Sequence, residues 1–269
     1  MTRPPKIIVF DSGLGGLTVF AEIVKLRPNA DYVYCADDAG FPYGSWKEDE
    51  LVQRVMQVME RLIDARTPDM VVIACNTAST LVLPYLRVHW PTISFVGTVP
   101  AIKPAAERSA SHVISVLGTP GTVARDYTQK LIAQFAGHCA VTLVGSKHLA
   151  RLAEAHMHGD PAPDAAIAAE IAPCFKTDAA SGARTDAIVL ACTHYPLLLD
   201  AFRRLAPWPV AWIDPAPAIA RRADQLLAAS VGADTPRDDA AHRRAVFTSD
   251  RASGSALRAT LARYGLSCA

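Results

Sequence analysis

The chain has 269 residues, and 51% of them are hydrophobic, which is enough to bury one large core or two modest ones. Its 27 basic and 26 acidic residues nearly cancel, so charge gives no reason to expect a nucleic acid or an anionic membrane as partner. No apolar run reaches transmembrane length, and the N-terminal residues lack the apolar stretch of a signal peptide. We therefore expect a cytoplasmic protein whose six cysteines are reduced thiols.

Short apolar runs alternate with amphipathic segments along the first hundred residues. The apolar runs predict strands at residues 7–10, 32–36, 70–74 and 94–96. The amphipathic segments predict helices at residues 17–26, 48–66 and from the end of the third strand to about 88. A glycine-rich turn from Asp11 to Gly16 follows the first strand, and Cys75 follows the third.

The alternation continues through the rest of the chain. Further strands are predicted at residues 112–117, 141–144, 187–191, 210–213 and 245–248. Further helices are predicted from the turn at 118–122 to about residue 135 and at residues 149–156, 165–175, 216–229 and 255–264. Another glycine turn follows the strand at 112–117, and Cys192 follows the strand at 187–191. Strands that alternate with helices imply parallel sheets with helices on both faces.

Because the glycine turn and the strand-to-cysteine corner each occur twice, we predict a weak internal duplication. The predicted fold is α/β, with two pseudo-symmetric lobes, each a mostly parallel sheet flanked by helices, and an active site in the cleft between them. We assign residues 1–98 and 209–269 to the first lobe and residues 99–208 to the second. Ligands bind at the carboxyl ends of parallel strands, so the two corners could direct two thiols at one small molecule.

Cys75 and Cys192 are the strongest candidates for chemistry. A single cysteine beside an apolar strand is more often a core residue, but two at matching corners favour a function. Each is expected to end a strand and enter a helix, whose N-terminus favours the thiolate, so we expect lowered thiol pKa values. No two cysteines form a C-x-x-C pair, so neither a zinc ribbon nor a thioredoxin-type site is indicated.

Donors for a substrate carboxylate directly follow the two thiols. They are Asn76, Thr77, Thr193 and His194. His194 either tunes Cys192 or is a satisfied polar residue, and its position next to the cysteine favours the first interpretation. Thr119 and Thr122 flank another helix start that suits an anion or serves only as a turn. The chain contains no Ser-His-Asp order and no G-x-S-x-G elbow.

Two turns of the first lobe are further candidates. The turn at Asp11 and Ser12 offers free backbone N–H groups to an anion, or it is a tight turn in which Asp11 caps a helix. It fails the dinucleotide pattern because Thr18 stands where the third glycine belongs. The turn at Tyr43 and Gly44 is either an ordinary loop or an edge that covers a ligand and presents a backbone N–H.

Five motifs in order resemble the glutamate racemase family of the aspartate/glutamate racemase superfamily. They are DSGLGGLTV from residue 11, PYG from 42, CNTAS from 75, GTPGTV from 118 and CTHYPLL from 192. Their common order and spacing make the resemblance specific. The CTHYP motif is similar to the glutamate enzymes, because aspartate racemases usually carry an acidic residue where His194 stands.

The resemblance implies a racemase that uses no cofactor and no metal, with Cys75 and Cys192 as the two proton-transfer residues. The substrate-binding residues that it implies are Asp11, Ser12, Tyr43, Gly44, Asn76, Thr77, Thr193 and His194. Asp11 and His194 would also assist the adjacent thiols. Glu154 matches a family glutamate with an assisting role, although the preceding Ser146-Lys147 and Arg151 depart from the family pattern.

The resemblance also implies glutamate as substrate, a homodimer and a role in supplying D-glutamate for peptidoglycan. The residue types suit the reaction, because a thiol can both accept and return the α-proton of an amino acid. No lysine lies in the five motifs, which argues against a pyridoxal Schiff base. The alternatives are an aspartate or hydantoin racemase, a cysteine hydrolase or acyl transferase with His194 as base, and a non-catalytic amino-acid-binding protein.

Overall fold

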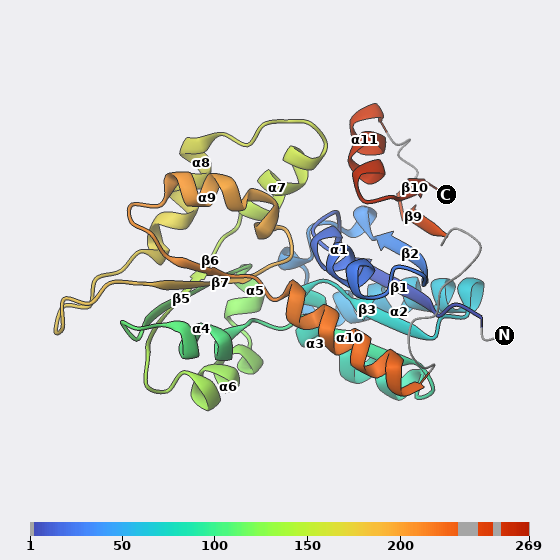
Figure 1. The fold of residues 1–269 in the computed structure, drawn as a ribbon, viewed down its shortest axis with the longest axis horizontal. Helices are drawn as coiled ribbons and strands as arrows, with labels where there is room; N and C mark the ends of the chain where they lie inside the picture. Colours follow the sequence, from blue (N-terminus) through green and yellow to red (C-terminus); the bar gives the residue numbers. More distant parts are fainter. Residues whose placement is uncertain (1–2, 231–241, 250–253, 269) are drawn as a thin grey trace.

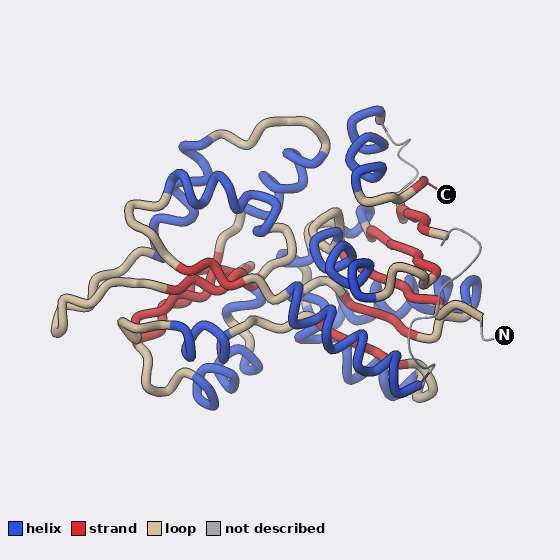
Figure 2. Tube along the Cα trace, viewed as in Figure 1, coloured by secondary structure: helices blue, strands red, loops and turns tan. Residues whose placement is uncertain are grey.

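The computed structural model describes residues 3–230, 242–249 and 254–268. It contains two parallel β-sheets, each with helices on both faces (Figures 1 and 2). In Figure 1 the first sheet lies on the side of both chain ends, and the second sheet lies on the opposite side. The predicted α/β fold with two lobes is confirmed. No helix in the described ranges is long and apolar enough to cross a membrane.

The first sheet is built around β1, the run Ile7 to Phe10 of the sequence. Its strands in spatial order are β10 (Ser267–Cys268), β9 (Arg243–Phe247), β2 (Asp31–Ala36), β1 (Lys6–Asp11), β3 (Met70–Ile73) and β4 (Ser94–Gly97). Ile7 and Val9 belong to one hydrophobic cluster, whereas Ile8 and Phe10 belong to the other. Side chains that alternate between two covered faces explain why the whole run is apolar.

Helices from both ends of the chain cover the first sheet. One face packs against α1 (Leu17–Leu26), α10 (Ala216–Ser230) and α11 (Ser255–Arg263). The other face packs against α2 (Glu48–Arg66) and α3 (Asn76–His89). The C-terminal part of the chain therefore completes the first lobe, as Figure 1 shows for α10 and α11.

The second sheet repeats this arrangement with fewer strands. Its spatial order is β6 (Ala140–Gly145), β5 (Val113–Gly118), β7 (Ala187–Ala191) and β8 (Ala211–Ile213). One face packs against α7 (Leu149–Met157), α8 (Asp164–Ile171) and α9 (Leu199–Leu205). The other face packs against α4 (Ile102–Arg108) and α6 (Asp126–Phe135), and the short α5 (Pro120–Val123) follows β5.

The two sheets share one strand order. The series β2-β1-β3-β4 in the first sheet corresponds to β6-β5-β7-β8 in the second, and all neighbouring strands in these series are parallel. Cys75 follows β3 and Cys192 follows β7, so the two cysteines occupy equivalent places. This is the arrangement expected of a duplicated lobe.

The predicted lobe boundary at residue 208 falls too early. β8 pairs with β7, with Ala187 opposite Ala211, so residues 211–213 belong to the second sheet. A three-residue edge strand carries too little apolar pattern for the sequence to assign it to one sheet or the other. We propose that the chain returns to the first lobe at about residue 214, directly before α10.

Two local predictions also need correction. The helix predicted at 165–175 ends at Ile171 and continues as a 3₁₀ turn over Ala172–Cys174. No helix is predicted between the strand at 32–36 and the helix at 48–66, but the structure has 3₁₀ turns at Asp38–Gly40 and Tyr43–Ser45. Such short turns need little apolar periodicity, so sequence pattern alone does not reveal them.

Candidate active site

The two thiols lie at the carboxyl ends of equivalent strands, but their corners differ. β3 ends at Ile73, and Cys75 is the extended residue directly before α3. Cys192 directly follows β7, and a 3₁₀ turn over Tyr195–Leu198 separates it from α9. The predicted entry from cysteine into a helix is therefore found at Cys75 only. Both cysteines are nearly inaccessible, with exposed fractions of 6% and 7%.

Polar contacts join the two thiols into one cluster. The Cys75 thiol donates to Ser12 Oγ over 3.9 Å. Next to Ser12, Asp11 Oδ2 lies 4.0 Å from His194 Nδ1, and the interaction of His194 with Cys192 raises the pKa of the imidazole. The structure thus brings Asp11, Ser12, Cys75, Cys192 and His194 together where the two lobes meet.

His194 is held as a cation in this cluster. Burial alone would lower the pKa of its imidazole. Hydrogen bonds to Cys192 and Glu154 and the negative charge of Asp11 outweigh burial and raise the pKa well above its ordinary value. A positive charge next to Cys192 stabilises negative charge on that sulfur.

Glu154 connects this cation to the opposite lobe. Its Oε2 lies 2.8 Å from His194 Nε2 and accepts the backbone N–H of Leu14 at 2.9 Å. Burial would raise the pKa of this carboxyl, but hydrogen bonds to His158 and His194 lower it below the ordinary value. Glu154 is therefore an anion that touches the glycine turn of the first lobe and the cysteine corner of the second.

The predicted lowering of the Cys75 pKa is wrong. Burial raises the pKa of this thiol well above its ordinary value, and the charge of Asp11 raises it further. Hydrogen bonds from the Ala78 backbone and with Ser12 act in the opposite direction but do not outweigh burial. Cys75 is consequently a neutral thiol, despite its place at the start of α3.

Asn76 is a buried amide without a partner. Its exposed fraction is 2%, and neither its Oδ1 nor its Nδ2 has a hydrogen-bond partner among the described residues. A buried polar group without a partner costs free energy, so such groups are rare outside functional sites. A bound ligand with donors and acceptors would satisfy it.

Threonines from both lobes meet next to Asn76. Thr77 Oγ1 lies 3.1 Å from Thr119 Oγ1 and 3.3 Å from Thr122 Oγ1. The backbone of Gly44 also reaches this group, because a Cβ added to it would lie 3.1 Å from Thr119 Cβ. At the corner that carries Cys192, the Thr193 carbonyl accepts the Thr18 hydroxyl at 3.5 Å.

Tyr43 is placed differently from the other candidates. Its hydroxyl donates to Asp37, and its ring is buried beside Phe10 and Trp46. The phenol is therefore occupied inside the first lobe, and the backbone of the turn is the part that approaches Thr119.

Asp37 and Arg54 are not among the residues that the sequence patterns predict. Asp37 Oδ2 accepts the Arg54 Nε–H at 3.0 Å, and its Oδ1 accepts the Thr248 hydroxyl at 2.6 Å. These contacts fix the turn that carries Tyr43. A signal existed, since Asp37 directly follows a predicted strand, at the edge of the sheet where ligands bind.

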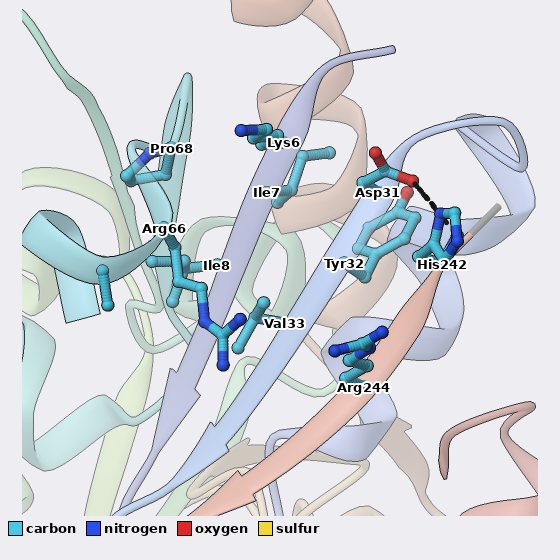
Figure 3. A pocket seen from close by; sticks show the side chains of 11 residues that line it. Lys6, Ile7, Ile8, Asp31, Tyr32, Val33, Arg66, Pro68, His242 and Arg244 are labelled. Atoms are coloured by element: carbon cyan, nitrogen blue, oxygen red, sulfur yellow. Dashed lines mark hydrogen bonds and ion pairs between the residues drawn. The ribbon is translucent and has the colours of Figure 1, made fainter. Parts of the chain in front are cut away.

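Two cavities lie at opposite edges of the first lobe. One, of about 350 Å³, is lined by both lobes, with Gly44 on one side and Thr119 and Arg151 on the other. The other, of about 230 Å³, lies at the amino ends of β1 and β2 and is lined by Lys6 and Asp31 among others (Figure 3). No predicted site residue lines the second cavity, so it is separate from the candidate site.

Comparison with known proteins identifies the family. The model of the Asp/Glu/Hydantoin racemase family matches residues 17–223. The chain belongs to this racemase family. A glutamate racemase of Brucella anthropi is 59% identical over 221 residues, which cover 82% of this chain and 79% of the relative. A glutamate racemase of Rhizobium meliloti is 54% identical over 250 residues, covering 93% of this chain and 88% of the relative.

Solved structures agree with this assignment. The structure of Escherichia coli glutamate racemase, in complex with L-glutamate and the activator UDP-MurNAc-Ala, has a TM-score of 0.87 and 37% identity. The match covers 98% of this chain and 97% of that one. The resemblance predicted from five motifs is confirmed, and this racemase is an isomerase that acts on amino acids.

Proposed function

We propose that this racemase interconverts L- and D-glutamate without a cofactor, by proton transfer between the α-carbon and the thiols of Cys75 and Cys192. The assignment of glutamate is supported by the glutamate racemases that are 54–59% identical to it. One observation supports the two-cysteine mechanism above all others: a single buried cluster contains both thiols, one from each lobe. Two groups on opposite faces of one carbon are what racemisation requires.

The charges of the cluster support a different role for each sulfur before substrate binds. The Cys75 thiol is kept neutral by burial and by Asp11, so it is the acid. We assign the base to Cys192, because it lies beside the His194 cation at the same corner of the second lobe. The Cys192 thiolate takes the α-proton, the electron pair of the C–H bond moves toward the α-carboxylate, and Cys75 gives its proton to the opposite face. The roles reverse for the other enantiomer.

The developing carbanion needs donors at the α-carboxylate. Asn76 is the best candidate, because its buried amide lacks a partner among the described residues. Thr77 and Thr193 are further candidates, since both are buried next to the thiols. Fixed donors of this kind stabilise transition-state charge more than water does. We assign the side-chain carboxylate of glutamate to Ser12 and the Gly44 backbone N–H.

Replacement of each thiol tests the mechanism. Cys75→Ser and Cys192→Ser should each reduce racemisation of L-glutamate by at least about 10³-fold, because an acid–base group is lost and serine is a much weaker acid. Cys174→Ala is the matched control: this cysteine is also buried, with a pKa raised to about 12, but lies in the core of the second lobe. Full activity of either serine variant would refute the two-cysteine mechanism.

Three wider expectations remain part of the proposal. Following the family resemblance, we propose a cytoplasmic homodimer that supplies D-glutamate for peptidoglycan. Light scattering of the purified protein gives the oligomeric state. Comparison of L-glutamate with L-aspartate as substrates separates this activity from that of an aspartate racemase.

A further inference from the structure

Two histidines and a cysteine lie together at the amino ends of two strands of the second sheet. The candidate active site lies at the opposite, carboxyl ends of the strands. His112 directly precedes β5, and His138 and Cys139 directly precede β6. The strands pair in parallel with Val113 opposite Ala140, and the Ala140 N–H donates to the His112 carbonyl at 2.7 Å. The backbone therefore fixes His112 and Cys139 as neighbours across the strand pair.

The side chains converge as metal ligands do. One ring nitrogen of His112, one of His138 and Cys139 Sγ all lie within 4.8 Å of one another. The two imidazole rings are 5.3 Å apart between centroids and nearly perpendicular. Ligands at about 2.0–2.3 Å from a tetrahedral zinc ion lie roughly 3–4 Å apart, so small rotations of the two exposed imidazoles suffice.

Local backbone geometry holds His112 and His138 at the starts of their strands. His112 has a φ of +56°, a left-handed conformation that is uncommon for residues other than glycine. The Cys139 N–H donates to the Ala136 carbonyl at 2.9 Å, which closes the turn that carries His138. The two turns therefore place His112 and His138 side by side at the start of the strand pair.

We propose that His112, His138 and Cys139 form a surface site for one thiophilic divalent metal ion, with Zn²⁺ as the preferred ion and water as a fourth ligand. Imidazole and thiolate ligands favour zinc over Mg²⁺ and Ca²⁺, which prefer oxygen. As the sulfur–metal bond forms, the Cys139 S–H bond breaks and its proton passes to the solvent. The bound ion would tie the start of β5 to the turn before β6.

Metal titration of the purified full-length protein tests this site. After treatment with a chelator, the protein should bind one Zn²⁺ in competition with a chromophoric indicator, and Co²⁺ should produce a thiolate-to-cobalt absorption band. Cys139→Ser should abolish the band and weaken Zn²⁺ binding at least about tenfold, as should His138→Ala. Cys268→Ser and His89→Ala, which lie outside the cluster, are the matched controls. Unchanged binding by Cys139→Ser would refute the site.

A second test uses the wild-type protein, so its result does not depend on whether the variants fold. Zn²⁺ should protect Cys139 of the wild-type chain from alkylation, as read by mass spectrometry of its peptides, whereas Mg²⁺ should not. Equal labelling with and without Zn²⁺ would contradict the proposal. Because no residue of the candidate active site takes part, Cys139→Ser should racemise glutamate at the wild-type rate, which separates this proposal from the proposed function.

Discussion

The charge on His194 depends on two carboxylates that come from different lobes. Asp11 is the last residue of β1, directly before the first glycine turn, and Glu154 belongs to α7. Together they outweigh the burial of the imidazole and keep it protonated beside Cys192. The protonated form of His194 stabilises the fold below its ordinary pKa, and this contribution is lost as the pH rises through the raised value.

Replacement of Glu154 should therefore change how kcat depends on pH. Glu154→Gln removes one of the charges that raise the His194 pKa, so the alkaline fall of kcat should begin at a lower pH than in the wild type. At the pH optimum we expect a loss of about ten- to hundredfold, less than the loss of an acid–base group itself. Rate profiles across the pH range, with Glu107→Gln on the exposed face of α4 as control, measure both effects. An unshifted alkaline limb would contradict this role of Glu154.

The residue types allowed members of the candidate site to be predicted, but not the direction of the pKa shift at Cys75. Cys75 and Cys192 could be named because each directly follows a predicted apolar strand, and His194 because it lies close behind Cys192. The raised pKa of Cys75 could not be predicted, because burial depends on the helices that cover the sheet. The contact of Glu154 with His194 joins residues 40 positions apart, and only the packing of α7 creates it.

The glycine turn after β1 and the cysteine corner after β7 make close contact through Gly15. A Cβ at this position would lie 2.3 Å from His194 Nδ1 and 2.7 Å from the His194 backbone nitrogen. No side chain fits there without a shift of the lobes or of the imidazole. The glycine of the motif is therefore explained by the contact between two elements from different lobes.

Gly15→Ala should accordingly damage catalysis more than stability. We expect a displaced His194 and a loss of about 10²-fold in kcat/KM, since small displacements of catalytic groups cost that much. The matched control is Gly121→Ala, because its nearest neighbour to an added Cβ is 3.7 Å away. Steady-state kinetics and a crystal structure of Gly15→Ala check the expectation. Wild-type activity in that variant would contradict the close contact.

The turn that carries Tyr43 and Gly44 depends on a buried carboxylate of the preceding strand end. Asp37 is fully buried, whereas the Arg54 side chain is 28% exposed. Hydrogen bonds to Arg54 and Thr248 lower the Asp37 pKa although burial acts against them. The ionised Asp37 therefore stabilises the fold above its ordinary pKa, and this contribution is lost as the pH falls through the lowered value.

Asp37→Asn should destabilise the protein at neutral pH by about 3 kcal/mol, because it leaves the partly buried Arg54 without its counter-ion. Urea unfolding at pH 7 measures the change in free energy. The control is Arg3→Ala, which breaks a similar two-pronged pair with Asp69 on the surface and should cost less than about 1 kcal/mol. Equal destabilisation by both variants would refute the importance of the buried pair.

The molecule as a whole consists of two similar lobes whose strand ends face each other. The alternating elements and the doubled motifs allowed both the α/β class and the equivalence of the two cysteine corners to be predicted. The sheet that receives β8 could not be predicted, because pairing at a sheet edge is decided by tertiary contacts. The site itself arises only when the lobes come together, so no single segment of the sequence contains it.

Exchange of the α-proton of L-glutamate in deuterated water tests the central claim most directly. With wild-type protein and no added cofactor, we predict that optical rotation is lost and that the D-glutamate formed carries deuterium at the α-carbon from the first turnovers. The remaining L-glutamate should gain deuterium only as the reverse reaction sets in, because each face has its own thiol. Formation of D-glutamate that retains the original α-proton, or equal early labelling of both enantiomers, would contradict proton transfer by two separate cysteines.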